Sequence, residues 1–377
     1  MTGEIFQFGT SRFLQAHVAL FAHEAAEAGQ TIPPITIVQV TGAAERAGRL
    51  AAFNDPKGYP VLLRGLQDNA IVDRRIQVRS VRRGLAVQTQ WGELRDSFVR
   101  EAEWVVSNVG DSGYDLSDAA LVPDAFGAEH PPTGYPALLT VLLFERWRHN
   151  PTPLKILPCE LISRNGEMLK GIVMRLAPIL SADAAFAAWL KDDVLWANSL
   201  VDRIVSEPIE PAGAVAEPYA LWAVQRQRGL YMPFDHPAVI MTDDLDRHER
   251  LKLHILNLGH TVIADRWLGE HAPADMTVRM FLEDNDRVEW LRTIFRDEVV
   301  PAFALAGWEG AAQDYIATTI DRFRNPFLDH RIADIAKNHS QKLERRVAEC
   351  LRWARQSDPH FEAPELAAIA AGHNPSV

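Results

Sequence analysis

The chain has 377 residues, of which 47% are hydrophobic and 24% are charged, as is common for a globular protein. This length is too great for one small core and favours two domains. The 39 basic and 50 acidic residues give a net charge of -11, which opposes non-specific binding to nucleic acid or to an anionic membrane surface.

The N-terminal half alternates between strand and helix patterns. The apolar run at residues 5–8 predicts a strand that Gly9 ends, and residues 12–26 carry apolar side chains at helical spacing. Residues 35–41 are rich in β-branched side chains and predict a second buried strand, which completes a βαβ unit. Further strands are expected at residues 59–64, 76–81, 104–107 and 154–162, with a helix at 166–177. This alternation predicts a mostly parallel sheet.

The pattern changes after about residue 247, where long helical stretches replace the strands. These stretches cover residues 249–268, 278–295 and 340–353. We place the boundary between residues 233 and 243, which gives an N-terminal Rossmann-like domain at 1–240 and a mainly α-helical domain at 241–377. The fold class is therefore α/β, and we expect a modestly disordered tail from about Glu362.

The loop after the first strand is a candidate dinucleotide site. Backbone N–H groups and a helix dipole at this position favour a pyrophosphate, although Ser11 stands where a dinucleotide fingerprint has its second glycine. A lone glycine turn is weak evidence, so the loop by itself leaves cofactor binding open. The candidate cofactor contacts are Phe8, Gly9, Thr10, Ser11, Arg12, Phe13, Thr41, Ser107 and Asn108.

The choice between NAD and NADP rests on the end of the second strand. Thr41 and Gly42 stand there in place of an acidic residue that would bind a ribose hydroxyl, and Arg46 and Arg49 follow closely. This slightly favours a 2′-phosphate. Ordinary surface arginines on a helix are the alternative.

Three polar residues, Lys252, Asn257 and His260, interrupt an apolar helical stretch. In an α-helix Asn257 lies about 140° and His260 about 80° from Lys252, so one broad face can hold all three. Apolar neighbours would desolvate the Lys252 ammonium and lower its pKa toward the range useful for proton transfer. Alternatively Lys252 extends to water, Asn257 caps a neighbouring element and His260 is a core residue with satisfied hydrogen bonds.

The stretch from Lys252 to His260 resembles the K-x4-N-x2-H signature of the mannitol dehydrogenase family. Similar segments span nearly the whole chain and include residues 8–14, 107–108, 158–162, 200–205 and 322–327. The resemblance implies a Rossmann-like domain, a helical second domain and an active site between them without a metal. It also implies a nicotinamide cofactor, NAD slightly ahead of NADP, and a small sugar acid or polyol substrate.

The resemblance further implies roles for individual residues. Lys252 is the general acid/base, Asn257 polarises or holds the reacting oxygen, and His260 contacts the substrate. Asp202 matches an acidic residue near the family's site, with a structural Asp-Arg ion pair as the alternative. Arg322 and Asn325 match an R-F-x-N-P motif, and Arg322 or Arg324 is the candidate partner for a substrate carboxylate.

Departures from the family pattern bear on the substrate. Ser11 replaces the second loop glycine, Gln15 replaces a basic residue and His248 replaces a tyrosine, while Leu161 stands where mannitol-oxidising members have Asn. The last change favours reduction of a sugar acid such as tagaturonate or fructuronate. A polyol dehydrogenase of the mannitol or arabinitol type and a catalytically silent dinucleotide-binding protein are the alternatives.

The cysteines and histidines indicate neither a disulfide framework nor a metal site. Cys159 and Cys350 are far apart, and the histidines lack ligand spacing. The first residues lack the pattern of a secretory signal, and there is no apolar window of about 18 residues. We therefore expect a cytoplasmic monomer or small homo-oligomer with no nucleic-acid or membrane partner.

Overall fold

The computed structural model describes residues 3–42, 47–115 and 130–372. The chain divides into two compact units. The first comprises Met1–Leu63, Arg74–Ala216 and Ala220–Leu245, and the second comprises Arg64–Asp73, Glu217–Tyr219 and Asp246–Val377. Two short segments from the N-terminal part of the sequence, residues 64–73 and 217–219, therefore belong to the second unit, which the sequence patterns did not indicate.

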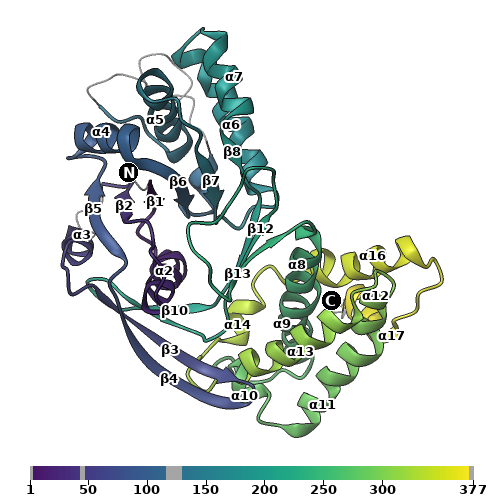
Figure 1. Ribbon diagram of the computed structural model, residues 1–377. Helices are drawn as coiled ribbons and strands as arrows, with labels where there is room; N and C mark the ends of the chain where they lie inside the picture. The colour runs from purple at the N-terminus through teal and green to yellow at the C-terminus, as the bar shows by residue number, and fades with distance from the viewer. Residues whose placement is uncertain (1–2, 43–46, 116–129, 373–377) are drawn as a thin grey trace. The chain divides into compact units, whose positions relative to one another are not determined.

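Six parallel strands form the main sheet of the first unit, in the order β5-β2-β1-β6-β7-β8 (Figure 1). The central strands are apolar and every residue of β1 is buried, as expected for a parallel sheet covered on both faces. The Rossmann-like fold predicted for the N-terminal part is confirmed. The strands are β1 (Glu4–Phe8), β2 (Ile35–Gln39), β5 (Val81–Ala86), β6 (Ala102–Ser107), β7 (Lys155–Pro158) and β8 (Leu195–Trp196).

Helices α4, α5 and α6 cover one face of this sheet, and α2 lies on the opposite face (Figure 1). Aromatic rings fill the first of these layers: the Phe6 and Phe98 ring centroids are 5.3 Å apart, and those of Phe8 and Tyr135 are also 5.3 Å apart. The helices are α1 (Arg12–Gln15), α2 (Val18–Glu27), α3 (Ala47–Phe53), α4 (Trp91–Glu101), α5 (Tyr135–His149), α6 (Asn165–Leu180) and α7 (Ala184–Asp192).

Two smaller sheets accompany the main one. Their strand orders are β10-β11-β3-β4 and β13-β12-β9. The hairpin of β3 and β4 turns at Asp68 and Asn69, which both have positive φ, as a two-residue turn that matches the strand twist requires. The strands are β3 (Tyr59–Gln67), β4 (Ala70–Val78), β9 (Ser199–Asp202), β10 (Val205–Pro208), β11 (Ala214–Ala216), β12 (Leu221–Gln225) and β13 (Val239–Thr242).

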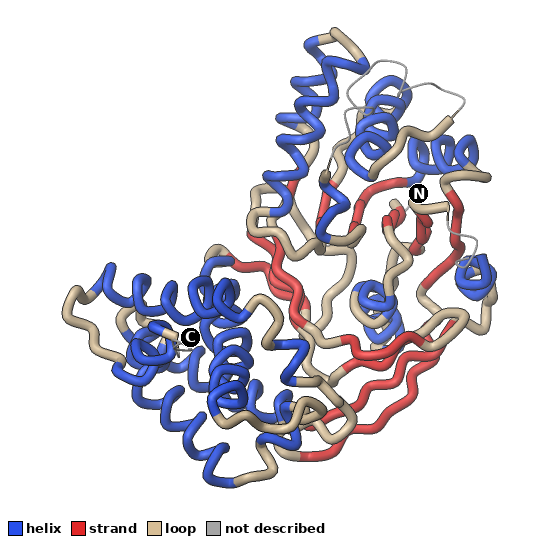
Figure 2. Tube along the Cα trace, turned by 180° about the vertical axis from the view of Figure 1, so that it is seen from behind, coloured by secondary structure: helices blue, strands red, loops and turns tan. Residues whose placement is uncertain are grey.

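The second unit is mainly helical, as predicted (Figure 2). In its described part, three longer helices contain a π-helical segment, and these segments are η5 (Lys252–Asn257), η6 (Phe295–Val299) and η7 (Leu343–Ala348). The other elements are α8 (Leu245–Leu251), α9 (Leu258–Gly269), α10 (Val278–Phe281), α11 (Asn285–Ile294), α12 (Val300–Ala304), α13 (Glu309–Phe323), α14 (Ile332–Ile335), α15 (His339–Lys342), α16 (Glu349–Ser357) and α17 (Pro364–Ala371).

Three predicted elements of the first unit are interrupted, divided or cut short in the structure. The helix expected at residues 12–26 is interrupted at Ala16 and His17, where the buried His17 ring bonds the Leu221 carbonyl at 3.1 Å. The strand expected at residues 76–81 is divided between β4 and β5, because Ser80 donates to the Ala19 carbonyl at 2.5 Å. The strand expected at residues 154–162 ends at Pro158.

The disordered tail expected from Glu362 is wrong as far as residue 372. Residues 364–371 form α17, and its Leu366 and Ile369 are buried in the core of the second unit. The carboxylate of buried Glu298 accepts hydrogen bonds from the backbone N–H groups of Glu365 and Leu366, both at 2.8 Å, and so caps the helix. Residues 373–377 lie outside the described ranges. Within those ranges, no helix combines the length and apolar character that crossing a membrane requires.

Candidate functional site

The loops after β1 and β6 meet at the carboxyl edge of the main sheet. In the order β5-β2-β1-β6-β7-β8, the chain proceeds from β1 to β2 on one side and from β6 to β7 on the other. The gap between β1 and β6 is therefore a topological switch point, where open α/β sheets bind their ligands. Gly9 follows β1 and Asn108 follows β6 at this gap.

Gly9 and Asn108 hold the two loops close together. Gly9 has a φ of +114°, and a Cβ added to it would lie 2.6 Å from the Asn108 carbonyl oxygen, so the position requires glycine. Ser11 Oγ donates to Asn108 Oδ1 at 3.3 Å, and Asn108 Nδ2 donates to the Cys159 carbonyl at 2.7 Å. The ends of β1, β6 and β7 are thus joined through one amide side chain.

The dipole of helix α1 contributes little to phosphate binding at this loop. Ser11 caps α1 by accepting from Leu14 N at 3.3 Å, but α1 has 4 residues. The dipole of one turn is small, so a dinucleotide would depend on the backbone N–H groups of the loop and on close approach at glycine. At Gly110, with a φ of +93°, an added Cβ would have no neighbour within 4 Å among the described residues. These features fit a dinucleotide.

The backbone carbonyl of Thr10 accepts hydrogen bonds from two side chains. Gln15 Nε2 and Arg49 Nη1 donate to this carbonyl at 3.1 and 3.0 Å, and Gln15 Oε1 accepts from Gly213 N at 2.6 Å. An amide can donate and accept at once, which explains Gln15 at a position where the family has a basic residue. Arg49 therefore lies beside the candidate cofactor loop.

The other predicted cofactor contacts are distributed around this edge. Arg12 and Thr41 are exposed, and Phe13 stacks on His17 with ring centroids 4.6 Å apart. Phe8 and Ser107 are buried at the ends of β1 and β6. Arg46, which bears on the choice between NAD and NADP, lies outside the described residues.

In the second unit, Lys252 and Asn257 are the first and last residues of the π segment η5. A π-helix bonds residue i to i+5, so residues five apart lie closer to one line than in an α-helix. The angle of about 140° expected for this pair from α-helical geometry is therefore too large. Lys252 and Asn257 are partly exposed and His260, one turn further on, is 8% exposed.

Hydrogen bonds from buried and partly buried polar side chains stabilise the π segment. Arg346 Nη1 donates to the Asn257 carbonyl at 3.2 Å and to Thr261 Oγ1 at 3.0 Å, and Thr261 Oγ1 donates to the same carbonyl at 2.9 Å. The His254 ring bonds the Arg346 carbonyl at 3.2 Å and stacks on Trp353. Burial lowers the pKa of His254 to about 4, so this ring is neutral near pH 7.

The His260 ring packs between two other rings. Its centroid lies 4.4 Å from that of Phe323 and 5.1 Å from that of His330. Gly259 permits this packing, because an added Cβ would lie 2.8 Å from Phe295 Cζ and 2.9 Å from Phe323 Cε2. Phe323 belongs to the R-F-x-N-P motif, which connects this motif with the K-x4-N-x2-H helix.

Arg322 and Asn325 bind the two segments that join the second unit from the N-terminal part of the chain. Arg322 Nε and Nη2 donate to the two carboxylate oxygens of Glu217 at 3.0 and 2.8 Å, and both side chains are 2% exposed. Asn325 Nδ2 donates to the Arg64 carbonyl at 3.1 Å. Asp202, the third predicted substrate contact, is buried at the end of β9 in the first unit.

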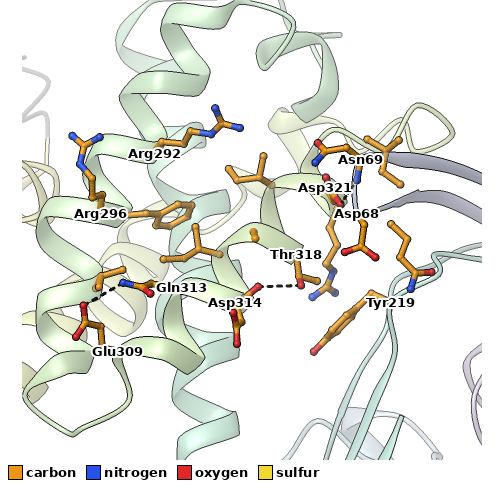
Figure 3. A pocket seen from close by; sticks show the side chains of 18 of the residues that line it. Asp68, Asn69, Tyr219, Arg292, Arg296, Glu309, Gln313, Asp314, Thr318 and Asp321 are labelled. Carbon is orange, nitrogen blue, oxygen red and sulfur yellow. Dashed lines mark hydrogen bonds between the residues drawn. The ribbon is translucent and has the colours of Figure 1, made fainter. Parts of the chain in front are cut away.

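A pocket of about 1090 Å³ lies in the second unit, between the β3–β4 turn and helices α11 to α13 (Figure 3). Tyr219, Phe295 and Ile320 contribute apolar surface, and Asp321 is tied to the turn by the Asn69 N–H at 3.1 Å. Lys252, Asn257 and His260 do not line it. In the described ranges, no group of three or more His, Cys, Asp or Glu residues could hold a metal ion.

Two family models match the chain. The mannitol dehydrogenase Rossmann domain matches residues 3–231, and the mannitol dehydrogenase C-terminal domain matches residues 244–373. An altronate oxidoreductase of Halalkalibacterium halodurans is 26% identical over 91% of this chain and 69% of its own length. Another, from Enterobacter sp. (strain 638), is 30% identical over 83% of this chain and 68% of its own length.

Solved structures show the same fold. A D-sorbitol dehydrogenase in substrate-free form has a TM-score of 0.78 at 19% identity, covering 94% of this chain and 77% of its own. The Pseudomonas fluorescens mannitol 2-dehydrogenase in a ternary complex with NAD and D-mannitol has a TM-score of 0.70 at 18% identity, covering 98% of this chain and 78% of its own.

Proposed function

Because this chain belongs to the mannitol dehydrogenase family, we propose that it is an oxidoreductase that uses a nicotinamide dinucleotide to interconvert a ketone and a secondary alcohol on a sugar acid. The relatives named altronate oxidoreductase favour tagaturonate and altronate as the substrate pair, with fructuronate and mannonate as close analogues. Leu161, which stands where mannitol-oxidising members have Asn, favours the same reaction on a sugar acid.

The observation that carries this proposal is the π-helical presentation of Lys252 and Asn257 at the start and end of η5. π segments are rare and frequently occur at functional sites, because they add one residue to a turn and redirect side chains. Here the inserted turn coincides with the K-x4-N-x2-H signature. Its carbonyl at Asn257 is held by Arg346 and Thr261, which keeps the irregular turn in place.

The proposed dinucleotide site is the switch point between β1 and β6. The loop of Gly9, Thr10 and Ser11 would bind the pyrophosphate through backbone N–H groups, and Asn108 would border it on the β6 side. When bound, the nicotinamide supplies or accepts the hydride of the reaction. We propose that exposed Thr41 and Arg49, which bonds the Thr10 carbonyl, contact the adenosine ribose, and we propose NAD ahead of NADP from the family resemblance.

Lys252 is proposed to move the proton. In the reducing direction its ammonium donates a proton to the oxygen of the former ketone, and in the oxidising direction its amine accepts that proton. Asn257 and His260 donate hydrogen bonds to the same oxygen and stabilise the negative charge that develops there.

The far carboxylate of a sugar acid needs a cation. The guanidinium of Arg322 already forms two hydrogen bonds with Glu217, whereas Arg324 is exposed. Arg324 is therefore the stronger of the two candidates for this carboxylate. Asp202 and Asn325 are proposed to bind substrate hydroxyls.

A polyol dehydrogenase is the second candidate. The solved structures of similar fold are a sorbitol dehydrogenase and a mannitol 2-dehydrogenase. Leu161 argues against it, because this apolar side chain, 66% exposed after β7, offers no hydrogen bond to a polyol hydroxyl.

A cofactor-by-substrate screen tests the proposal. Reduced NAD and NADP are each offered with tagaturonate and fructuronate, and the oxidised forms with altronate, mannonate, mannitol and arabinitol, following absorbance of the reduced nicotinamide. We expect turnover on the hexuronates, and the same rate in the presence of a chelator. Turnover confined to the polyols would establish the second candidate. Dinucleotide binding without turnover on any substrate would instead indicate a silent binding protein.

A further inference from the structure

Glu160 is a buried carboxylate that binds one loop through three hydrogen bonds. It follows β7 and is 3% exposed. Its Oε2 accepts from Ser107 Oγ at 3.1 Å and from Tyr114 Oη at 2.9 Å, and its Oε1 accepts from Val109 N at 3.1 Å. All three donors belong to residues 107–114, which run from the last residue of β6 to the end of the short 3-10 helix η2 (Asp111–Tyr114) and are called the β6 loop below.

This loop forms one side of the switch point between β1 and β6. It carries Asn108, which bonds both Ser11 and the Cys159 carbonyl, and Gly110, where an added Cβ would have no described neighbour within 4 Å. Asn108 contacts the residue immediately before Glu160. The start, middle and end of the loop are therefore all fastened to Cys159 and Glu160.

The backbone of Glu160 is itself fixed. Asn165 Nδ2 donates to the Glu160 carbonyl at 3.1 Å, to the Pro158 carbonyl at 3.1 Å and to the Ser199 carbonyl at 3.0 Å. Asn165 is fully buried at the start of α6. The carboxylate thus extends from a rigid support at the end of β7 toward the loop.

Burial of a carboxylate at this position is unfavourable for the stability of the fold. Burial raises the pKa of Glu160, while the hydrogen bonds from Tyr114, Ser107 and Val109 act in the opposite direction. A buried charge is weak evidence for stability, because removing it from water offsets much of what its hydrogen bonds contribute. The Glu160 carboxylate instead fixes the shape of the loop. Its two oxygens accept three hydrogen bonds, from two hydroxyl groups and one backbone N–H of the loop.

We propose that Glu160 is a positioning residue that holds residues 107–114 in the conformation that accepts the nicotinamide dinucleotide. The inference rests on the proposed function and deepens it. Glu160 acts through the loop and touches neither reacting atom. Its loss should therefore weaken dinucleotide binding and leave the rate at saturating dinucleotide little changed.

The experiment measures dinucleotide binding directly. NADH is titrated by fluorescence into the wild type, Glu160→Ala, Glu160→Gln and the control Glu207→Ala, which removes an exposed carboxylate of the same unit. We expect the dissociation constant of Glu160→Ala to rise roughly 10-fold to 100-fold, as for the loss of one or two hydrogen bonds. Glu160→Gln should restore part of the affinity, because its amide can still accept from Val109 N and donate to the two hydroxyls.

Hydrogen exchange without dinucleotide gives a second readout. Amides of residues 107–114 should exchange faster in Glu160→Ala than in the wild type, with exchange in the second unit unchanged. If the wild type binds dinucleotide and Glu160→Ala matches it in affinity and loop exchange, the inference is overturned and the proposed function stands. If the wild type binds neither NADH nor NADPH, both fail.

Two more conservative variants keep the test decisive if Glu160→Ala does not fold. If circular dichroism shows that Glu160→Ala does not fold, Glu160→Gln and Tyr114→Phe carry the comparison, since each removes fewer hydrogen bonds. A raised dissociation constant in these folded variants supports the inference. Wild-type affinity in both of them overturns it.

Discussion

The two units position their proposed functional residues by different means. In the first, a regular parallel sheet brings the ends of β1, β6 and β7 to one edge, and short loops there carry Gly9 and Asn108. In the second, Lys252 and Asn257 lie on an irregular turn of a helix, which Arg346 fastens from another π segment. A regular parallel sheet thus positions the proposed cofactor loops. A π-helical turn, stabilised by hydrogen bonds from Arg346, positions the proposed catalytic pair.

Two ion pairs, one from each unit, differ in how deeply they are buried. The Arg322–Glu217 pair of the second unit has both side chains 2% exposed. In the first unit, Lys155 bonds Glu103 at 2.8 Å with side chains 7% and 25% exposed. Loss of one charged partner should therefore destabilise the protein more at the Arg322–Glu217 pair than at the Lys155–Glu103 pair.

The largest predicted effect follows from this difference. Glu217→Gln leaves the Arg322 guanidinium buried without its carboxylate, which should lower the free energy of unfolding by about 3–5 kcal/mol. Glu103→Gln, the matched change in the first unit, should lower it by about 1 kcal/mol because solvent reaches that pair. Urea unfolding of both variants measures this. Equal losses would show that the two pairs are equivalent.

Buried neutral histidines in both units predict a loss of stability in acid. Burial lowers the pKa of His17 to about 3 and that of His254 to about 4, below the usual 6.5. Between pH 6.5 and these values the unfolded chain binds protons that the folded chain does not. Stability is therefore fully present above pH 6.5 and is lost as the pH falls, by on the order of a few kcal/mol for each ring.

Urea unfolding at neutral and acidic pH checks this prediction. His17→Phe and His254→Phe should each lose less free energy of unfolding than the wild type when the pH is lowered, because each lacks one proton-binding ring. His271→Phe serves as the control, because that ring is exposed. The same loss in all four proteins would assign the acid sensitivity to other groups.

Replacing one glycine in each unit by alanine compares how tightly the two positions are packed. At Gly259 an added Cβ would lie 2.8 Å from Phe295 Cζ, so Gly259→Ala should destabilise the second unit by about 1–3 kcal/mol. At Gly171, within α6 of the first unit, an added Cβ would meet nothing within 4 Å. Gly171→Ala should therefore stabilise by about 0.5–1 kcal/mol. Calorimetric melting temperatures that shift in the same direction would contradict the packing described at Gly259.

The smallest predicted effect concerns the cofactor loop. Ser11→Gly removes the cap on Leu14 N from a helix of 4 residues, and should change the free energy of unfolding by a few tenths of a kcal/mol. It also restores the glycine of a dinucleotide fingerprint. We expect NADH affinity equal to or above that of the wild type, measured by the same fluorescence titration. A clear loss of affinity would show that the Ser11 hydroxyl contributes to binding.

The sequence predicted the first unit better than the second, for a physical reason. Runs of β-branched and apolar residues such as 35–39 identify buried strands locally, and a glycine after a strand identifies the loop. The break at His17 could not be seen, because it depends on a hydrogen bond to Leu221, distant in sequence. The sequence also gave no sign that Glu160 fastens the β6 loop, since its three partners precede it by about 50 residues.

In the second unit the helices were predicted and their irregularities were not. Apolar periodicity assumes about 100° per residue, and residues 249–268 satisfy it well enough to conceal η5. The prediction of a disordered tail from Glu362 is wrong for a similar reason. Helix α17 is capped by Glu298, which lies 67 residues earlier in the sequence. The R-F-x-N-P motif likewise gives no sign that Arg322 is buried and bonds Glu217.

The most direct test of the central claim is the turnover of Lys252→Ala with tagaturonate and NADH, alongside NADH binding by the same protein. Lys337→Ala, which removes an exposed lysine of the same unit, is the control. We predict that Lys252→Ala lowers kcat by about 10²–10⁴-fold and leaves NADH affinity unchanged, since the proposed role of this lysine is proton transfer and the proposed dinucleotide site belongs to the first unit. Near-normal turnover in the folded variant would contradict the assignment of Lys252 as the proton donor.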